Sequence, residues 1–193
     1  MAGTADELTP AELAVQISSL LAEAGIRHAI GGALAFGFYA SPRGTVDVDM
    51  NVFVAADRPH GALDVLAAGG VAIDREQAVE VIGSRGDLFV EHGGCRLDFF
   101  FNSIPLHASA SERARTVELL GTPVPVLSAE DLVVLKLLFN RHKDIVDIEA
   151  IVESSGDKLD VAYVRHWLVE CVGSDDTRVA TWEGLLGEAV KRD

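Results

Sequence analysis

The sequence predicts an α+β fold, in which a small mixed β-sheet flanked by helices is followed by a C-terminal helical bundle. Residues 46–54 and 95–101 alternate apolar and polar side chains, which is the period of a strand with one buried face. After Ser128, apolar residues recur at helical spacing. The change of pattern near Leu127 divides the chain into an expected core domain over 1–127 and an expected helical domain over 128–193.

The first expected helix begins at a capping box. Thr9 is its N-cap, Pro10 its first helical residue and Glu12 the acid that completes the box, and Gly25 marks its end. The other elements expected in the core domain are an apolar run over 26–30, short helices over 33–39 and 59–68, a turn over 41–44, and short strands over 80–82, 88–91, 117–119 and 124–127.

The helical domain is expected to open at Ser128, whose side chain can cap a helix, with Asp131 as the acid three residues later. Apolar side chains at helical spacing then fill most of the remaining chain. Helices are expected over 130–140, 143–154, 161–172 and 176–191.

The composition argues against several classes of protein. No run of about 18 apolar residues is present, so we expect no membrane span. Residues 1–9 contain no Lys or Arg, unlike a secretory signal, and Cys95 and Cys171 show neither metal spacing nor a disulfide framework, so we expect a cytoplasmic protein. The net charge of −14 argues against a surface that coats nucleic acid, but it allows a local basic patch that grips one RNA end.

Three carboxylates form the strongest candidate for chemistry. Asp47 and Asp49 lie two residues apart on an expected strand, so both project from one face. Asp98 lies on a second expected strand and shares that face if the two strands are neighbours. Carboxylates so close together repel each other unless a cation lies between them, and Mg²⁺ prefers oxygen ligands. We therefore expect a magnesium site at Asp47, Asp49 and Asp98, with room for two ions, which Mn²⁺ could also fill.

Residues before the paired acids suggest a phosphate site. Gly31 and Gly32 lie between an apolar run and an expected helix, where glycines let the backbone approach a phosphate. Arg43 and Thr45 come just before the acids, and Arg43 is expected either to pair with a triphosphate or to brace Asp49.

These parts occur in a meaningful order. Residues 30–54 read IGGALAFGFYASPRGTVDVDMNVFV, with two glycines at a strand end, a short helix, an Arg-x-Thr turn and an Asp-x-Asp strand. This order resembles the nucleotidyltransferase superfamily of the DNA polymerase β type, and Asp98 in CRLDFFF resembles its third carboxylate. Gly32 stands where serine is more usual, so the resemblance implies phosphate contact through the backbone alone.

A second block, residues 128–152, reads SAEDLVVLKLLFNRHKDIVDIEAIV and resembles the AbiE-type nucleotidyltransferase toxins of type IV toxin–antitoxin systems. On a helix, residues 136, 140, 143 or 144, and 147 would form one polar stripe, while apolar residues including Phe139 would be buried. The motif residues of this block are Lys136, Arg141, Lys143, Asp144 and Asp147.

The resemblance implies roles for these residues. Lys136 would touch the NTP phosphates and Asp144 would support the site. In the mechanism that we hypothesise, Asp98 would bind the second ion and accept the proton of the attacking hydroxyl. The implied catalytic residues are Asp47, Asp49, Asp98 and Lys136, and the implied NTP-binding residues are Gly31, Gly32, Arg43, Thr45, Lys136, Arg141 and Asp144.

The sequence leaves the acceptor open. One hypothesis is transfer of a nucleoside monophosphate from an NTP, guessed to be a pyrimidine, to the 3′ end of tRNA by a toxin that has an antitoxin protein as its partner. A second is transfer to a small molecule, as in aminoglycoside nucleotidyltransferases, because an acidic cleft attracts a cationic acceptor. A third is a nucleotide-binding module without catalysis.

Overall fold

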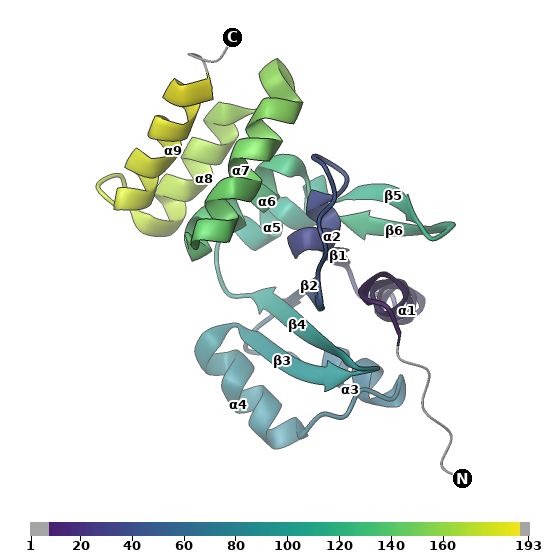
Figure 1. Cartoon of the computed structure of the whole chain (residues 1–193). Helices are drawn as coiled ribbons and strands as arrows, with labels where there is room; N and C mark the ends of the chain where they lie inside the picture. The colour runs from purple at the N-terminus through teal and green to yellow at the C-terminus, as the bar shows by residue number, and fades with distance from the viewer. Residues whose placement is uncertain (1–7, 190–193) are drawn as a thin grey trace.

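Figure 1 shows the computed structural model of the chain, which describes residues 8–189. These residues contain a six-stranded sheet with the strand order β3-β4-β2-β1-β6-β5. Parallel and antiparallel pairs both occur in it, so the predicted mixed sheet is confirmed. The strands are β1 (His28–Ile30), β2 (Asp47–Ala55), β3 (Asp87–His92), β4 (Cys95–Asn102), β5 (Arg115–Leu119) and β6 (Thr122–Val126).

Helices flank this sheet, and a helical bundle follows it, as predicted. In Figure 1, α7, α8 and α9 lie side by side at the end of the molecule opposite α3 and α4. The helices are α1 (Pro10–Glu23), α2 (Gly32–Phe36), α3 (His60–Ala68), α4 (Arg75–Arg85), α5 (Leu106–Arg113), α6 (Ala129–Phe139), α7 (His142–Ser155), α8 (Val161–Val172) and α9 (Thr177–Ala189), with a short 3-10 helix η1 (Gly156–Lys158) after α7.

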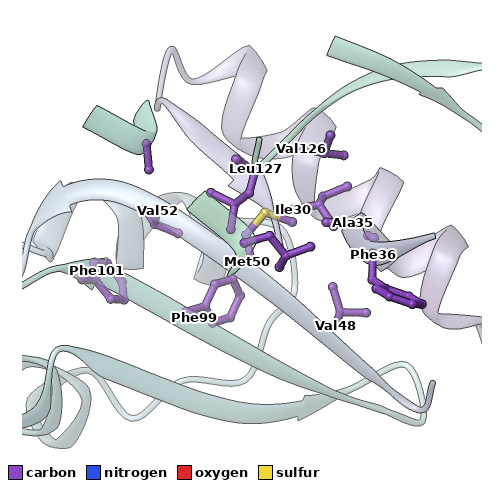
Figure 2. Packing of buried hydrophobic residues seen from close by; sticks show 14 of the residues in the cluster. Ile30, Ala35, Phe36, Val48, Met50, Val52, Phe99, Phe101, Val126 and Leu127 are labelled. Atoms are coloured by element: carbon purple, nitrogen blue, oxygen red, sulfur yellow. The ribbon is translucent and has the colours of Figure 1, made fainter. Parts of the chain in front are cut away.

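Strand β2 connects the core to the candidate site. It pairs antiparallel with β1 and parallel with β4. As the alternation predicts, Val48, Met50 and Val52 are completely buried, and Figure 2 shows them near Phe99 and Phe101 of β4. The polar residues of β2 therefore project from the opposite face of the sheet.

Helix α1 packs against β1, β2 and β6. Its predicted capping box is confirmed, because the Thr9 hydroxyl accepts the Glu12 N–H at 3.3 Å and the Glu12 carboxylate accepts the Thr9 N–H at 2.8 Å. Leu13, Ile17 and Leu21 form its buried stripe. Helix α1 covers the face of the sheet on which the apolar side chains of the central strands lie. Because side chains alternate along a strand, the polar side chains lie on the opposite face.

The short strand expected over 80–82 is wrong, because these residues lie inside α4. Asp74 caps that helix by accepting the Gln77 N–H at 3.1 Å, and Gly86 ends it in the left-handed conformation. Both helix signals were present in the sequence, but the adjacent apolar residues Val81 and Ile82 were given more weight. Helix α5 was not expected at all, since only three of its eight residues are buried.

The two helices expected over 130–140 and 143–154 are present as α6 and α7, but the polar stripe expected along one helix face across them is wrong. Helix α6 ends at Phe139, and Asn140 adopts a left-handed conformation with φ of 49° that turns the chain into α7. Ser128 caps α6, as predicted, by accepting the Asp131 N–H at 3.1 Å. The residues of the expected stripe are therefore brought together by a tight turn between two helices.

The proposed boundary at Leu127 falls between β6 and α6, and the division into two domains stays a prediction. Val190 and Lys191, the expected end of the last helix, lie outside the described residues, as does most of the N-terminal segment 1–9. Among the helices that the structure describes, none combines the length and the apolar character needed to cross a bilayer.

Candidate active site

A cleft of about 230 Å³ opens on the polar face of the sheet. Strands β2 and β4 contribute residues to one side of it, and α6 and the start of α7 contribute residues to the other. Acids from the strands, cations from the helices and a group of apolar side chains all line this single cleft.

The three predicted carboxylates face this cleft. Strands β2 and β4 run parallel, with Asp49 directly opposite Asp98 in the register, so the two side chains lie on one face of the sheet. Asp47 precedes Asp49 by two residues and shares that face. The structure therefore brings the predicted acids to one place, although only the strand pairing, and not the sequence, fixes this register.

The electrostatics at Asp49 are unusual. Burial raises the pKa of Asp49 to about 6, and the negative charge of Asp98 contributes in the same direction. Asp98 itself forms an ion pair with Arg96, whose Nε lies 2.7 Å from the Asp98 Oδ1. Within residues 8–189, no three acidic, histidine or cysteine side chains are gathered closely enough to hold a metal ion as they stand.

The acids nevertheless fit a divalent cation in their chemistry. Asp47 and Asp49 offer oxygen ligands beside Asp98. The pKa of Asp49 is raised first by burial and then by the charge of Asp98, and a bound cation would favour the ionised form of this carboxyl. Hard cations such as Mg²⁺ and Mn²⁺ bind such oxygens and often share them with phosphates.

The two glycines hold the turn after β1 against the acids. The Gly31 N–H donates to the Asp49 carbonyl oxygen at 2.8 Å. Gly32 has a φ of +54°, and a Cβ atom there would lie 1.7 Å from Oδ2 of Asp49. The glycine at position 32 is therefore required for this close approach, and a serine would displace the Asp49 carboxylate.

Three cations reach the cleft from three segments, and two buried acids of α7 hold them. Arg43 donates to Asp147 through Nε at 2.8 Å and through a second nitrogen at 2.7 Å. The Lys136 Nζ donates to the same carboxylate at 2.6 Å. Arg141 donates to both oxygens of Asp144, at 2.6 and 3.1 Å. Asp144 and Asp147 are at most 2% exposed. Lys136 is buried with them, whereas the Arg43 and Arg141 side chains are 37% and 54% exposed.

These contacts differ in part from the predicted roles. Arg43 pairs with Asp147 and not with Asp49. The Thr45 hydroxyl bonds the backbone of Asp47 at 3.1 Å, and neither Thr45 nor Gly31 lines the cleft. Gly32, Arg43, Lys136, Arg141 and Asp144 do line it, together with the three carboxylates.

Two features of the site were not predicted from the sequence, namely the contact of Asp147 with Arg43 and the exposure of Phe139. Asp147 belongs to the motif of residues 128–152, but its link to Arg43, 104 positions away, has no local signal. Phe139 was expected to be buried, yet half of its surface is exposed at the cleft. Its position three residues after Lys136 was the available signal, since residues at this spacing share a helix face.

Comparisons with known proteins show what this architecture is similar to. No family model matches the chain, and no curated protein matches it. The solution structure of the antibiotic-resistance factor ANT(2'')-Ia superposes with a TM-score of 0.57 at 15% identity, covering 92% of this chain and 97% of that one. The chain has the nucleotidyltransferase fold.

Weaker similarity extends to other solved structures. A nucleotidyltransferase-like protein from Paracoccidioides brasiliensis matches over 94% of this chain and 92% of its own, at 16% identity and a TM-score of 0.48. A crystal structure of ANT(2'')-Ia in complex with adenylyl-2''-tobramycin matches over 92% of this chain and 97% of its own, at 12% identity and a TM-score of 0.47. The particular resemblance to AbiE-type toxins stays a prediction.

Proposed function

We propose that this protein is a metal-dependent nucleotidyltransferase, which moves a nucleoside monophosphate from an NTP to an acceptor hydroxyl. The observation that carries the proposal is the pairing of Asp49 with Asp98 across β2 and β4, in the same cleft as Lys136 and Arg141. Neighbouring carboxylates can hold metal ions that bind phosphate, and nearby cations can stabilise the negative charge of a leaving pyrophosphate.

In the proposed reaction, the acceptor oxygen forms a bond to the α-phosphorus and the bond from that phosphorus to the β-phosphate oxygen breaks. Asp98 accepts the hydroxyl proton. Mg²⁺ or Mn²⁺, held by Asp47, Asp49 and Asp98, supplies positive charge to the phosphates when bound. Lys136 and Arg141 offset the charge that develops on pyrophosphate.

The 3′ end of tRNA, modified by a toxin, is our first acceptor proposal. It rests on the resemblance of residues 128–152 to AbiE-type toxins, and it includes an antitoxin protein as partner. Lys143 is exposed and lines the cleft beside Arg141, so this edge offers a local basic patch. Few phosphates would be neutralised there, and we therefore expect the protein to hold the end of an RNA and not its length.

A cationic small molecule is the second candidate acceptor, and charge favours it. The chain carries a net charge of −14, and three cations at the cleft are already paired with buried acids. The cleft therefore attracts a polyanion only weakly, and its lining includes the carboxylates of Asp47, Asp49 and Asp98. A polyamine or an aminoglycoside would be attracted by the same charges.

A labelling experiment tests the reaction and its acceptor. The protein is incubated with Mg²⁺ and each α-labelled NTP in turn, once with total tRNA and once with a panel of aminoglycosides. We expect label on one class of acceptor, lost with EDTA and reduced at least about a hundredfold by Asp49→Asn, since a metal contributes several kcal/mol to the transition state. Asp57→Asn is the control, because that side chain is 77% exposed.

The outcomes separate the hypotheses. Label on tRNA supports the RNA acceptor and names the nucleotide, and growth arrest on expression alone would support the toxin. Label on an aminoglycoside supports the small-molecule acceptor. A protein that binds NTP but labels nothing is the module without catalysis, and equal activity of Asp49→Asn and the wild type would refute the proposed site.

A further inference from the structure

Phe139 is an exposed aromatic side chain inside the candidate active site. Seven large apolar residues are exposed in the described part of the chain, and Phe139 is the one among them that lines the cleft. Half of its surface is accessible. An exposed ring in a cleft that already holds acids and cations indicates a surface for a flat apolar group.

The ring is held in place by its neighbours. Phe100 of β4 packs edge-on against it, with the ring centroids 5.9 Å apart. The Arg141 guanidinium lies over the ring, 4.9 Å from its centroid. Because Asp144 holds Arg141 through two hydrogen bonds, the arginine cannot easily swing across to cover the remaining surface. The accessible part of Phe139 is therefore kept open.

The ring also lies next to the residues proposed to bind phosphate. Lys136 precedes it by three positions on α6, which places the two residues on one face of that helix. Arg141 follows it by two positions and contacts it directly. A molecule that places its phosphates on these cations has its remaining part within reach of the ring, and in an NTP that part ends in a flat base.

We propose that Phe139 is the surface on which the base of the NTP stacks. The proposal rests on the nucleotidyltransferase function proposed above and adds the base-binding residue of the same site. Stacking on a phenyl ring uses the π-face that every base has, so it discriminates little between bases. Phe139 would thus contribute affinity for all four NTPs, and the choice among them would come from other residues.

The test compares nucleotides with a ligand that has no base. Binding of each NTP and of inorganic tripolyphosphate, both in the presence of Mg²⁺, is measured by calorimetry with wild-type protein, Phe139→Ala and Phe139→Tyr. We expect Phe139→Ala to weaken every NTP about five- to tenfold or more while tripolyphosphate binding stays unchanged. Phe139→Tyr should restore NTP binding, because it keeps the ring. Phe38→Ala, at an exposed ring outside the cleft, is the control.

Several results would overturn the proposal. Unchanged NTP affinity in Phe139→Ala, with a raised KM for the acceptor, would assign the ring to the acceptor. Equal weakening of NTP and tripolyphosphate would show a general disturbance of the site. If the wild type binds neither ligand, both this proposal and the proposed function fail. If it binds NTP in the predicted manner but transfers nothing, the base surface stands and the proposed function fails.

Discussion

Lys136 and Asp147 touch each other, yet replacing them should affect stability very differently. Their atoms Nζ and Oδ2 are 2.6 Å apart, and both side chains are at least 94% buried. Lys136→Met keeps Asp147 paired, because Arg43 still donates to both of its oxygens at 2.7 and 2.8 Å. No uncompensated charge is left in the interior, and methionine fills a similar volume. We therefore expect a loss of less than about 1 kcal/mol.

Asp147→Ala has the opposite consequence. It leaves Lys136 buried, with Asp144 at 3.8 Å as its remaining carboxylate neighbour. Removing one partner of a buried ion pair costs about 3–5 kcal/mol. The Arg43 side chain is 37% exposed and can turn into water, so its lost contact adds little. We expect the lower end of that range, about 3 kcal/mol.

Urea unfolding at pH 7 measures both changes, with the m-value as the check on two-state behaviour. The same two variants test function. Lys136→Met should lose most transfer activity although it remains folded, because the role proposed for Lys136 is to offset charge on pyrophosphate. Equal destabilisation by the two substitutions would refute the charge argument. Full activity of Lys136→Met would remove Lys136 from the catalytic residues.

Three further outcomes follow from single contacts. Gly32→Ala should abolish transfer, because a Cβ at this position would meet the Asp49 carboxylate. Gly44→Ala should leave the transfer rate unchanged, because a Cβ there has no atom within 4 Å. Comparing the transfer rates of the two variants with that of the wild type checks this. Burial lowers the pKa of His107 to about 4, below its usual 6.5. As the pH falls, the unfolded chain therefore takes up a proton at this residue before the folded protein does. We expect the free energy of unfolding to fall by about 3 kcal/mol between pH 6.5 and pH 4. Urea unfolding of the wild type and of His107→Gln at several pH values in that range checks this, because the free energy of unfolding should depend less steeply on pH in the variant. Tyr163→Phe removes the hydroxyl that donates to Asp131 at 2.5 Å and should cost about 1–3 kcal/mol in thermal or urea unfolding, because the acceptor is a buried carboxylate.

The fold class follows from patterns that act over short distances. The alternation in β2 and β4 predicts one buried face, and caps such as Thr9 and Ser128 mark where α1 and α6 begin. The misplaced strand at 80–82 shows the limit of this reasoning. Val81 and Ile82 fit a short strand as well as α4, in which Ile82 is buried. The choice depends on the packing of α4 against β3, which the local pattern does not contain.

The site could be predicted only in part, for the same reason. Asp47, Asp49 and Lys136 were identified because their motifs are compact in sequence, whereas Asp98 joins the first two only through the pairing of β2 with β4. The contact between Arg43 and Asp147 joins a turn to α7 across 104 positions, and the exposure of Phe139 depends on where α6 ends at Asn140. Both depend on tertiary packing. The sequence likewise predicts a turn at Gly32 but not its close approach to Asp49. That approach is what requires a glycine, and Asp49 belongs to a strand that only the tertiary fold brings beside the turn.

The paired cations also bear on the phosphate binding that we propose for this strongly acidic protein. Asp144 and Asp147 neutralise much of the positive charge that Arg43, Lys136 and Arg141 would otherwise present. Long-range attraction for a polyanion is therefore weak, but N–H donors remain, since an arginine has five and a lysine three. The buried acids hold these donors in fixed positions, which reduces the entropy lost when a ligand binds. We therefore expect the proposed site to favour a triphosphate whose charge a metal has already reduced, and the neighbouring carboxylates are the groups that would hold that metal.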